Sequence, residues 1–367
     1  MTGECEDTAP LPSGHGPTAL RHARRALAAA RGELRNSALK LLGYLLFAYL
    51  VLKLIPGLQQ ALRSLQHVRW QWLLGAFALE TLSEMGFVLS WRSIVDPENL
   101  LEREGRGRQM ATRAAWAQLG GGMLVPGGSL GGVGVGAWIL HRFGMPTKLI
   151  AERQFNLSFL NTSVDALALI VAGLGLASGI FPGESKLTLT LLPALLAAIG
   201  IAAVLLIARR ASAYAERVGN EHPKIARSIL TLADAVKDTE WLLCHRRGFK
   251  SVSGALVYLW FDLLVLWSSF SAIHAHPAPS FAVVVMAYII GALGGWIPLP
   301  ANIGTIGGMV GMFILYGVGH DAAVAAVLIY QAIGLLVPVI GGGIAYLFLR
   351  RHFGPVPTTS EQWLVES

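Results

Sequence analysis

Three carboxyl groups stand where the sequence is otherwise almost entirely apolar. Glu80 and Glu84 lie four residues apart in the apolar stretch 70–95, and Asp262 lies within the apolar stretch 251–272. A spacing of four places the two glutamates one turn apart on a single helix face. An ionisable group inside a membrane span is costly and by default marks a functional site. We predict that Glu84 and Asp262 line one polar cavity; the alternative is an internal hydrogen bond that holds helices together.

A second polar group interrupts the apolar sequence after residue 150, in the stretch AERQFNLSFLNTSVDAL. We predict that Arg153, Asn156 and Asp165 line the same cavity. Arg153 would face a phosphate, and the acids would face a cation or a proton. The alternative for Glu152 and Arg153 is a solvated or mutually paired position near the membrane surface.

The segment WIPLPANIGTIGG, residues 296–308, places two prolines and three glycines inside apolar sequence. Backbone that is not helical survives at membrane depth only when it is buried in protein or lines a wet cavity. Broken helices also leave free N–H groups at helix starts, which suit an anionic group such as a phosphate. We therefore predict that Pro300, Asn302 and Gly304 line the cavity; the alternative is that small residues let helices pack closely.

The elements that must position these residues are membrane-spanning helices. Of the 367 residues, 54% are hydrophobic and 14% are charged, whereas about a quarter of a soluble domain is charged. An apolar stretch of about 20 residues crosses a bilayer core of about 30 Å. Six such stretches occur, at 38–57, 70–95, 149–178, 188–208, 251–272 and 321–349. The polar first 37 residues argue against a cleavable signal peptide.

Positive charge gathers in four regions beside these spans: before the first, after the second, in the loop 209–250 and after the last. This is the positive-inside pattern, so both termini and the loop 209–250 are predicted to be cytoplasmic. The pattern accounts for the excess of 29 Lys and Arg over 22 Asp and Glu, and it excludes a nucleic-acid partner. Cys5 and Cys244 both fall on the predicted cytoplasmic side, which argues against a disulfide framework and against a Cys-rich metal site.

The same sidedness predicts two re-entrant hairpins. Residues 114–146 must start and end inside, whereas residues 279–319 must start and end outside. The two halves also match weakly in sequence, with Asn156 falling on Gln331, which adds Gln331 to the predicted site. Hairpins that enter from opposite faces indicate an inverted repeat, an arrangement that recurs in secondary transporters.

These features predict an all-α integral membrane protein with about six transmembrane helices and two oppositely entering re-entrant hairpins in an inverted repeat. The predicted parts are a partly disordered, basic cytoplasmic N-terminus (1–37), a transmembrane domain (38–350) and a cytoplasmic tail (351–367). The transmembrane domain consists of halves at about 70–208 and 251–350, joined by the loop 209–250.

Two pairs of segments resemble a known family. GALGGWIPLPANIGTIGGMVGMFILYGV and AAVAAVLIYQAIGLLVPVIGG resemble the second-half signature of the lysylphosphatidylglycerol synthase transmembrane region, also called the flippase-like family. GGGMLVPGGSLGG and AERQFNLSFLNTSVDAL are similar to its first half. The resemblance covers roughly residues 40–350 and implies that a lipid with a polar headgroup is moved between leaflets. Only 16 residues follow Arg351, so we do not expect the cytosolic transferase activity of the two-part members, or their synthesis of an aminoacyl lipid, to carry over to this chain.

We therefore expect a flippase of the cytoplasmic membrane that translocates a lipid or lipid-linked precursor. Two alternatives stay open: a membrane-embedded enzyme that acts on lipid headgroups, and a secondary transporter of a small polar solute. We expect no enzyme activity, no cofactor and no metal, and a separate lipid-modifying enzyme is a candidate partner. The predicted substrate-binding residues are Glu84, Arg153, Asn156, Asp165, Asp262, Pro300, Asn302, Gly304 and Gln331.

Overall fold

The computed structural model describes residues 70–103, 109–124, 129–183, 186–218, 246–273, 275, 278–296 and 303–353. All of the described residues belong to one compact unit of the chain. The predicted N-terminal segment, the predicted span 38–57 and most of the loop 209–250 lie outside the described residues. Pro300 and Asn302 of the predicted site also lie outside them.

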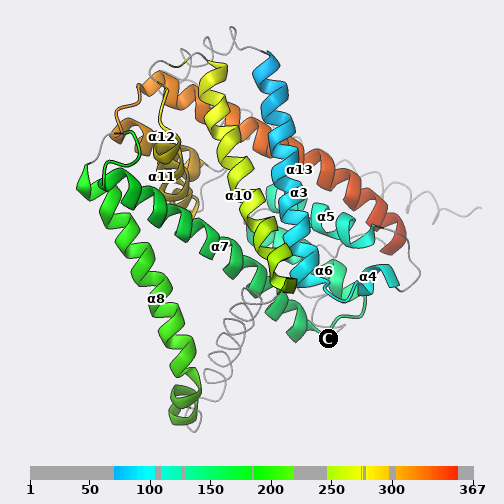
Figure 1. Ribbon diagram of the computed structural model, residues 1–367. Helices are drawn as coiled ribbons and strands as arrows, with labels where there is room; N and C mark the ends of the chain where they lie inside the picture. The colour runs from blue at the N-terminus through cyan, green and yellow to red at the C-terminus, as the bar shows by residue number, and fades with distance from the viewer. Residues whose placement is uncertain are drawn as a thin grey trace, which may run out of the picture. The chain divides into compact units, whose positions relative to one another are not determined.

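Long apolar helices dominate the described part of the chain (Figure 1). They are α3 (Trp70–Val95), α7 (Thr147–Ala177), α8 (Leu187–Val218), α10 (Arg246–Ala272) and α13 (His320–Phe353). Each contains a stretch that is long and apolar enough to cross a membrane. The all-α membrane fold is therefore confirmed, and five of the six predicted spans form helices at the predicted positions.

The two glycine-rich segments form pairs of short helices. The first pair is α5 (Met110–Leu124) and α6 (Ser129–Arg142), preceded by the single turn α4 (Leu100–Arg103). The second pair is α11 (Phe281–Ala292), which ends in the 3₁₀ turn η2 (Leu293–Trp296), and α12 (Ile303–Leu315). All four helices are shorter than the roughly 20 residues that a full crossing requires. Their entry from opposite faces of the membrane stays a prediction, because helix length alone does not assign a face.

The described helices repeat in order and in packing. Long, short, short and long helices follow one another in α3–α5–α6–α7 and again in α10–α11–α12–α13. The first long helix of each half packs against its counterpart, α3 on α10. The halves also exchange partners, since α5 packs on α13 in the way that α11 packs on α7. This order supports the predicted internal repeat, whereas its inversion across the membrane stays a prediction.

Glycines bring α3 and α10 into backbone contact. A Cβ atom added at Gly86 would lie 2.6 Å from the backbone nitrogen of Tyr258, and one added at Gly254 would lie 2.6 Å from that of Ser90. The Ser83 hydroxyl donates across the same contact to the Tyr258 carbonyl at 2.7 Å. Small residues at helix contacts are typical of membrane proteins, where close backbone packing replaces the hydrophobic effect. This contact fixes the positions of the acidic residues on α3 relative to those on α10.

A buried amide network joins α3, α5 and α7. The Trp91 indole N–H donates to Gln118 Oε1 at 2.8 Å, and the amide groups of Gln118 and Gln154 donate to each other at 2.9 Å. All three residues are buried. The network therefore sets the position of the hairpin helix α5 against two long helices.

Replacing Gln118 with leucine is expected to lower the free energy of unfolding by about 1–3 kcal/mol, because it leaves the Trp91 indole and the Gln154 amide buried without a partner. Thr81→Val is the matched control, since the Thr81 hydroxyl bonds only to Phe77 of its own helix. Thermal unfolding of the detergent-solubilised protein measures both. Equal melting temperatures for the two variants would show that the network contributes nothing.

Candidate functional site

Five helices bring acids and phenols together at one buried place. The acid–tyrosine cluster consists of Glu80 and Glu84 on α3, Asp165 on α7, Tyr258 and Asp262 on α10, Tyr288 on α11, and Tyr330 on α13. The structure therefore brings together Glu84, Asp165 and Asp262, which the sequence assigned to one cavity. Both halves contribute, and Glu84 and Asp262 each lie near the middle of their helix, α3 and α10.

Asp262 is the hydrogen-bonded centre of the cluster. The hydroxyl groups of Tyr288 and Tyr330 both donate to its Oδ2 atom, the second of them at 3.1 Å. The two tyrosine rings meet edge to face, with centroids 6.1 Å apart and planes at 80°. Because Asp262 is only 6% exposed, the two phenols supply what water supplies to a surface carboxylate. This arrangement holds one side of the aspartate in place and ties α10 to α11 and α13.

Glu80 and Glu84 are less well satisfied. They are 4% and 3% exposed, and the Oε2 atom of each has no hydrogen-bond partner. The Glu80 carboxyl also reaches toward α13, since a Cβ added at Gly334 would lie 3.6 Å from its Oε1 atom. A buried carboxyl oxygen without a partner is costly and requires an explanation. The two glutamates are therefore the members of the cluster whose hydrogen-bonding capacity is not used within the described residues.

The carboxyl groups interact electrostatically with one another. Asp262 acts on Glu80, Glu84 and Asp165, and Glu84 acts on Glu80 as well. Within the described residues, none of the four forms an ion pair with lysine, arginine or histidine; the ion pairs found are Arg92–Glu102, Lys148–Glu152, Arg153–Glu98 and His320–Asp321. Like charges confined to a buried site cannot all be present together. The site therefore has negative character and is suited to protons, cations or hydrogen-bond donors.

Arg153 does not join the cluster. Its guanidinium donates to the Val95 carbonyl at 2.8 Å and pairs with Glu98 at 2.9 Å, which places it beside the end of α3. The neighbouring Asp96 is buried and accepts from the Leu100 N–H at 2.7 Å. Burial raises the pKa of the Asp96 carboxyl, although hydrogen bonds from backbone N–H groups act in the opposite direction. Arg153 thus stabilises the junction between α3 and α4, where its charge neutralises that of the exposed Glu98.

The other predicted residues fall at separate places. Asn156 is buried with its Oδ1 atom unpartnered, but nine residues separate it from Asp165, which puts the two on opposite faces of α7. Gln331 is half-buried and follows Tyr330 directly. Gly304 packs its backbone against Gly294 of η2, which is a helix contact of the kind that the packing alternative describes.

The sequence prediction missed the role of the three tyrosines. Tyr258 precedes Asp262 by one helical turn, as Glu80 precedes Glu84, and this shared spacing was the available signal. Tyr288 gives no such signal, because it lies in a short hairpin helix whose packing depends on contacts distant in sequence.

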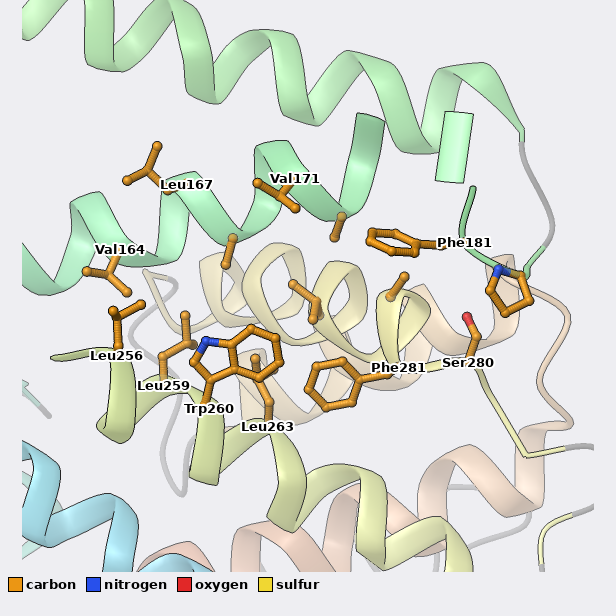
Figure 2. Close-up of a pocket in the computed structure, with 15 residues that line it drawn as sticks. Val164, Leu167, Val171, Phe181, Leu256, Leu259, Trp260, Leu263, Ser280 and Phe281 are labelled. Atoms are coloured by element: carbon orange, nitrogen blue, oxygen red, sulfur yellow. The ribbon is translucent and has the colours of Figure 1, made fainter. Parts of the chain in front are cut away.

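An apolar groove lies beside the cluster, between α7, α10 and α11 (Figure 2). Its volume is about 480 Å³, and all but one of its lining residues are apolar. Trp260 and Phe281 stack along it with ring centroids 5.2 Å apart. The groove residues Val164, Leu263 and Leu259 are the direct sequence neighbours of Asp165, Asp262 and Tyr258. The groove and the cluster are therefore adjacent parts of the same helices, one apolar and the other acidic.

The fold and this site define a multi-pass α-helical membrane protein with a buried acidic centre. The chain belongs to the family of the lysylphosphatidylglycerol synthase transmembrane region, whose model matches residues 39–342. The resemblance seen in the sequence is thereby confirmed, and it relates the protein to the handling of lipid headgroups. No curated protein matches the chain in a sequence comparison.

Proposed function

We propose that the protein translocates a lipid, or a lipid-linked precursor, with a polar headgroup across the cytoplasmic membrane. The adjacency of the acid–tyrosine cluster and the apolar groove on α7, α10 and α11 carries this proposal. A lipid has the same division into a polar headgroup and apolar chains. The headgroup would bind among the acids and phenols while an acyl chain lies in the groove. The headgroup could then cross the membrane without entering the apolar bilayer core.

The groove favours this function over transport of a small polar solute, and the composition of the cluster favours it over an enzyme. A small polar solute would gain nothing from a 480 Å³ apolar groove beside its site. An enzyme acting on headgroups would require a nucleophile or a metal with a convergent acid–base pair. The cluster offers acids and phenols, which suit recognition by hydrogen bonds. As part of the proposal, both termini and the loop 209–250 face the cytoplasm, and a separate enzyme supplies or modifies the lipid.

Reconstitution of the purified full chain into liposomes tests the function directly. Phospholipids labelled with a fluorophore on one chain, with different headgroups, are placed in both leaflets, and an impermeant reductant then bleaches the outer one. Translocation is expected to expose the inner-leaflet label and to bleach it as well, for at least one headgroup. Bleaching that stops at the outer leaflet for every headgroup, as in protein-free liposomes, would refute the proposal.

Filling the groove is expected to slow translocation. In Ala168→Phe the added ring would occupy groove volume that an acyl chain needs, and overfilling a packed site costs about 1–3 kcal/mol, equivalent to a rate at least about fivefold lower. Ala202→Phe is the control, because Ala202 is an exposed residue of α8 away from the groove. The liposome assay measures both variants. Equal rates for Ala168→Phe and the parent would remove the groove from the lipid path.

A further inference from the structure

We propose that the acid–tyrosine cluster is a proton-binding site that releases protons when a headgroup with hydrogen-bond donors enters. Lipid movement in one direction would then be coupled to proton movement in the other. This inference rests on the proposed lipid translocation and adds its driving force. Three observations support it. The cluster consists of acids and phenols, one oxygen of each glutamate has no hydrogen-bond partner, and Asp262, unlike the glutamates, accepts two hydrogen bonds from phenols.

Every titratable side chain found at the cluster is an acid or a phenol. They are Glu80 and Glu84 from α3, Asp165 from α7, Tyr258 and Asp262 from α10, Tyr288 from α11, and Tyr330 from α13. No basic residue of the described ranges is paired with any of them. Four carboxylates without a counter-ion in a buried site repel one another strongly. Bound protons are the simplest way in which such a site reaches a low net charge.

The hydrogen bonds indicate which members hold the protons. Asp262 accepts from two phenols, and donors of this kind stabilise the charged form of a carboxyl group. Glu80 and Glu84 each have a buried Oε2 atom with no donor in reach. A proton on such an atom removes the charge and turns the carboxyl group into a donor. The glutamates are thus the members that hold protons, and Asp262 is the member best suited to carry the negative charge.

A proton fits this arrangement better than a metal ion. Within the described residues, no group of three or more His, Cys, Asp or Glu side chains is placed to hold a metal. A headgroup hydroxyl or ammonium, by contrast, requires only one acceptor at a time. When an ammonium group donates to a glutamate oxygen, its positive charge takes the place of the proton's, so the carboxyl O–H bond breaks and the proton passes to water on the side from which the lipid came. When the lipid leaves, the carboxylate takes up a proton from the opposite side, so that charge and atoms balance over the cycle.

Proton release by the solubilised full chain tests the first half of this proposal. Short-chain phosphatidylglycerol, which carries hydroxyl donors, and short-chain phosphatidylethanolamine, which carries an ammonium group, are added in weak buffer with a pH-indicating dye. Phosphatidylethanolamine is expected to cause the release of roughly one proton per bound lipid, because its ammonium group compensates the carboxylate charge that the proton leaves behind. Proton uptake, or binding without any change, would overturn the proposal.

Variants assign the release to the cluster. Glu80→Gln with Glu84→Gln keeps the size of both side chains but removes both proton sites, and the release is expected to fall at least about fivefold. Asp321→Asn is the control, because Asp321 is an exposed acid that contacts only His320. Full release by the double variant would overturn the assignment. If the double variant does not fold, the proton count on the parent chain still decides whether protons are exchanged.

A pH gradient across reconstituted liposomes tests the proton coupling separately from the proposed lipid translocation. For one proton exchanged per lipid, a gradient of one pH unit is expected to enrich the lipid in one leaflet by up to about tenfold, and collapse of the gradient abolishes the enrichment. Translocation that ignores the gradient would overturn the coupling and leave the proposed function intact. Failure of any labelled lipid to move, with or without a gradient, would overturn both.

Discussion

Gly86→Ala is expected to destabilise the protein by about 3 kcal/mol, enough to lower its yield and its melting temperature sharply. The added methyl group would lie 2.6 Å from the Tyr258 nitrogen and 2.7 Å from the Gly254 oxygen, and both are backbone atoms that no side-chain rotation can move. Helices α3 and α10 must then separate, which also opens the contact that the Ser83 hydroxyl makes to α10. Overpacking of a core typically costs about 1–3 kcal/mol, and a clash between two backbones belongs at the upper end of that range.

Gly75→Ala provides the matched control for this effect. Gly75 lies on the same helix, and no atom would lie within 4 Å of its added Cβ. Since alanine favours a helix over glycine by roughly 1 kcal/mol in soluble hosts, this variant is expected to be as stable as the parent or slightly more so. The yield of monodisperse protein and its melting temperature in detergent measure both changes. The same melting temperature for Gly86→Ala and Gly75→Ala would contradict the close helix contact.

Asp262→Asn is expected to slow lipid translocation at least about tenfold while leaving the protein in the membrane. Asparagine keeps the size of the side chain but removes the charge on which the two phenol hydrogen bonds converge. Hydrogen bonds to a charged group are worth about 1.5–3 kcal/mol, so loss of the charge corresponds to a decrease in rate of at least about tenfold. Glu84→Gln is expected to act in the same direction, because its buried carboxyl group interacts with Asp262.

Glu152→Gln is the control for these substitutions, since Glu152 pairs only with the exposed Lys148. The liposome assay, with the amount of reconstituted protein determined in parallel, distinguishes three outcomes. Slow translocation at a normal protein level supports the proposed site. Disappearance of Asp262→Asn from the membrane would show that the aspartate holds the helices together, and a normal rate would remove it from the mechanism.

The spans and the central acid pair could be predicted because their signals are local. A run of about 20 apolar residues and a glutamate repeated after one turn are visible within a single helix, and these signals placed Glu84 and Asp262 correctly within α3 and α10. That Glu84 and Asp262 lie close together could also be predicted. Burying a charge in lipid is costly, so the protein interior is the only suitable place for both.

The partners of the acids could not be predicted in the same way. For Arg153 the sequence predicted a phosphate partner and gave no sign of its ion pair with Glu98, 55 residues away, because that pairing depends on how α7 meets the end of α3. Asn156 was grouped with Asp165 because both interrupt one apolar stretch, although nine residues place them on opposite faces of the helix. Tyr288 reaches Asp262 from a hairpin helix whose position depends on contacts between glycines and distant backbone, as at Gly291 against Met309.

The exchange of packing partners between the two halves has a consequence for how the protein is made. A ribosome completes α3, α5 and α7 well before it reaches α10, α11 and α13. Until then, the glycine face of α3 lacks the helix that fills it, and α5 lacks α13, against which Gly120 and Gly342 bring the two backbones together. During synthesis, the early helices must therefore be held in the membrane without the partners that α10, α11 and α13 supply. Assembly of the protein is a late event, which waits for the last helix to arrive.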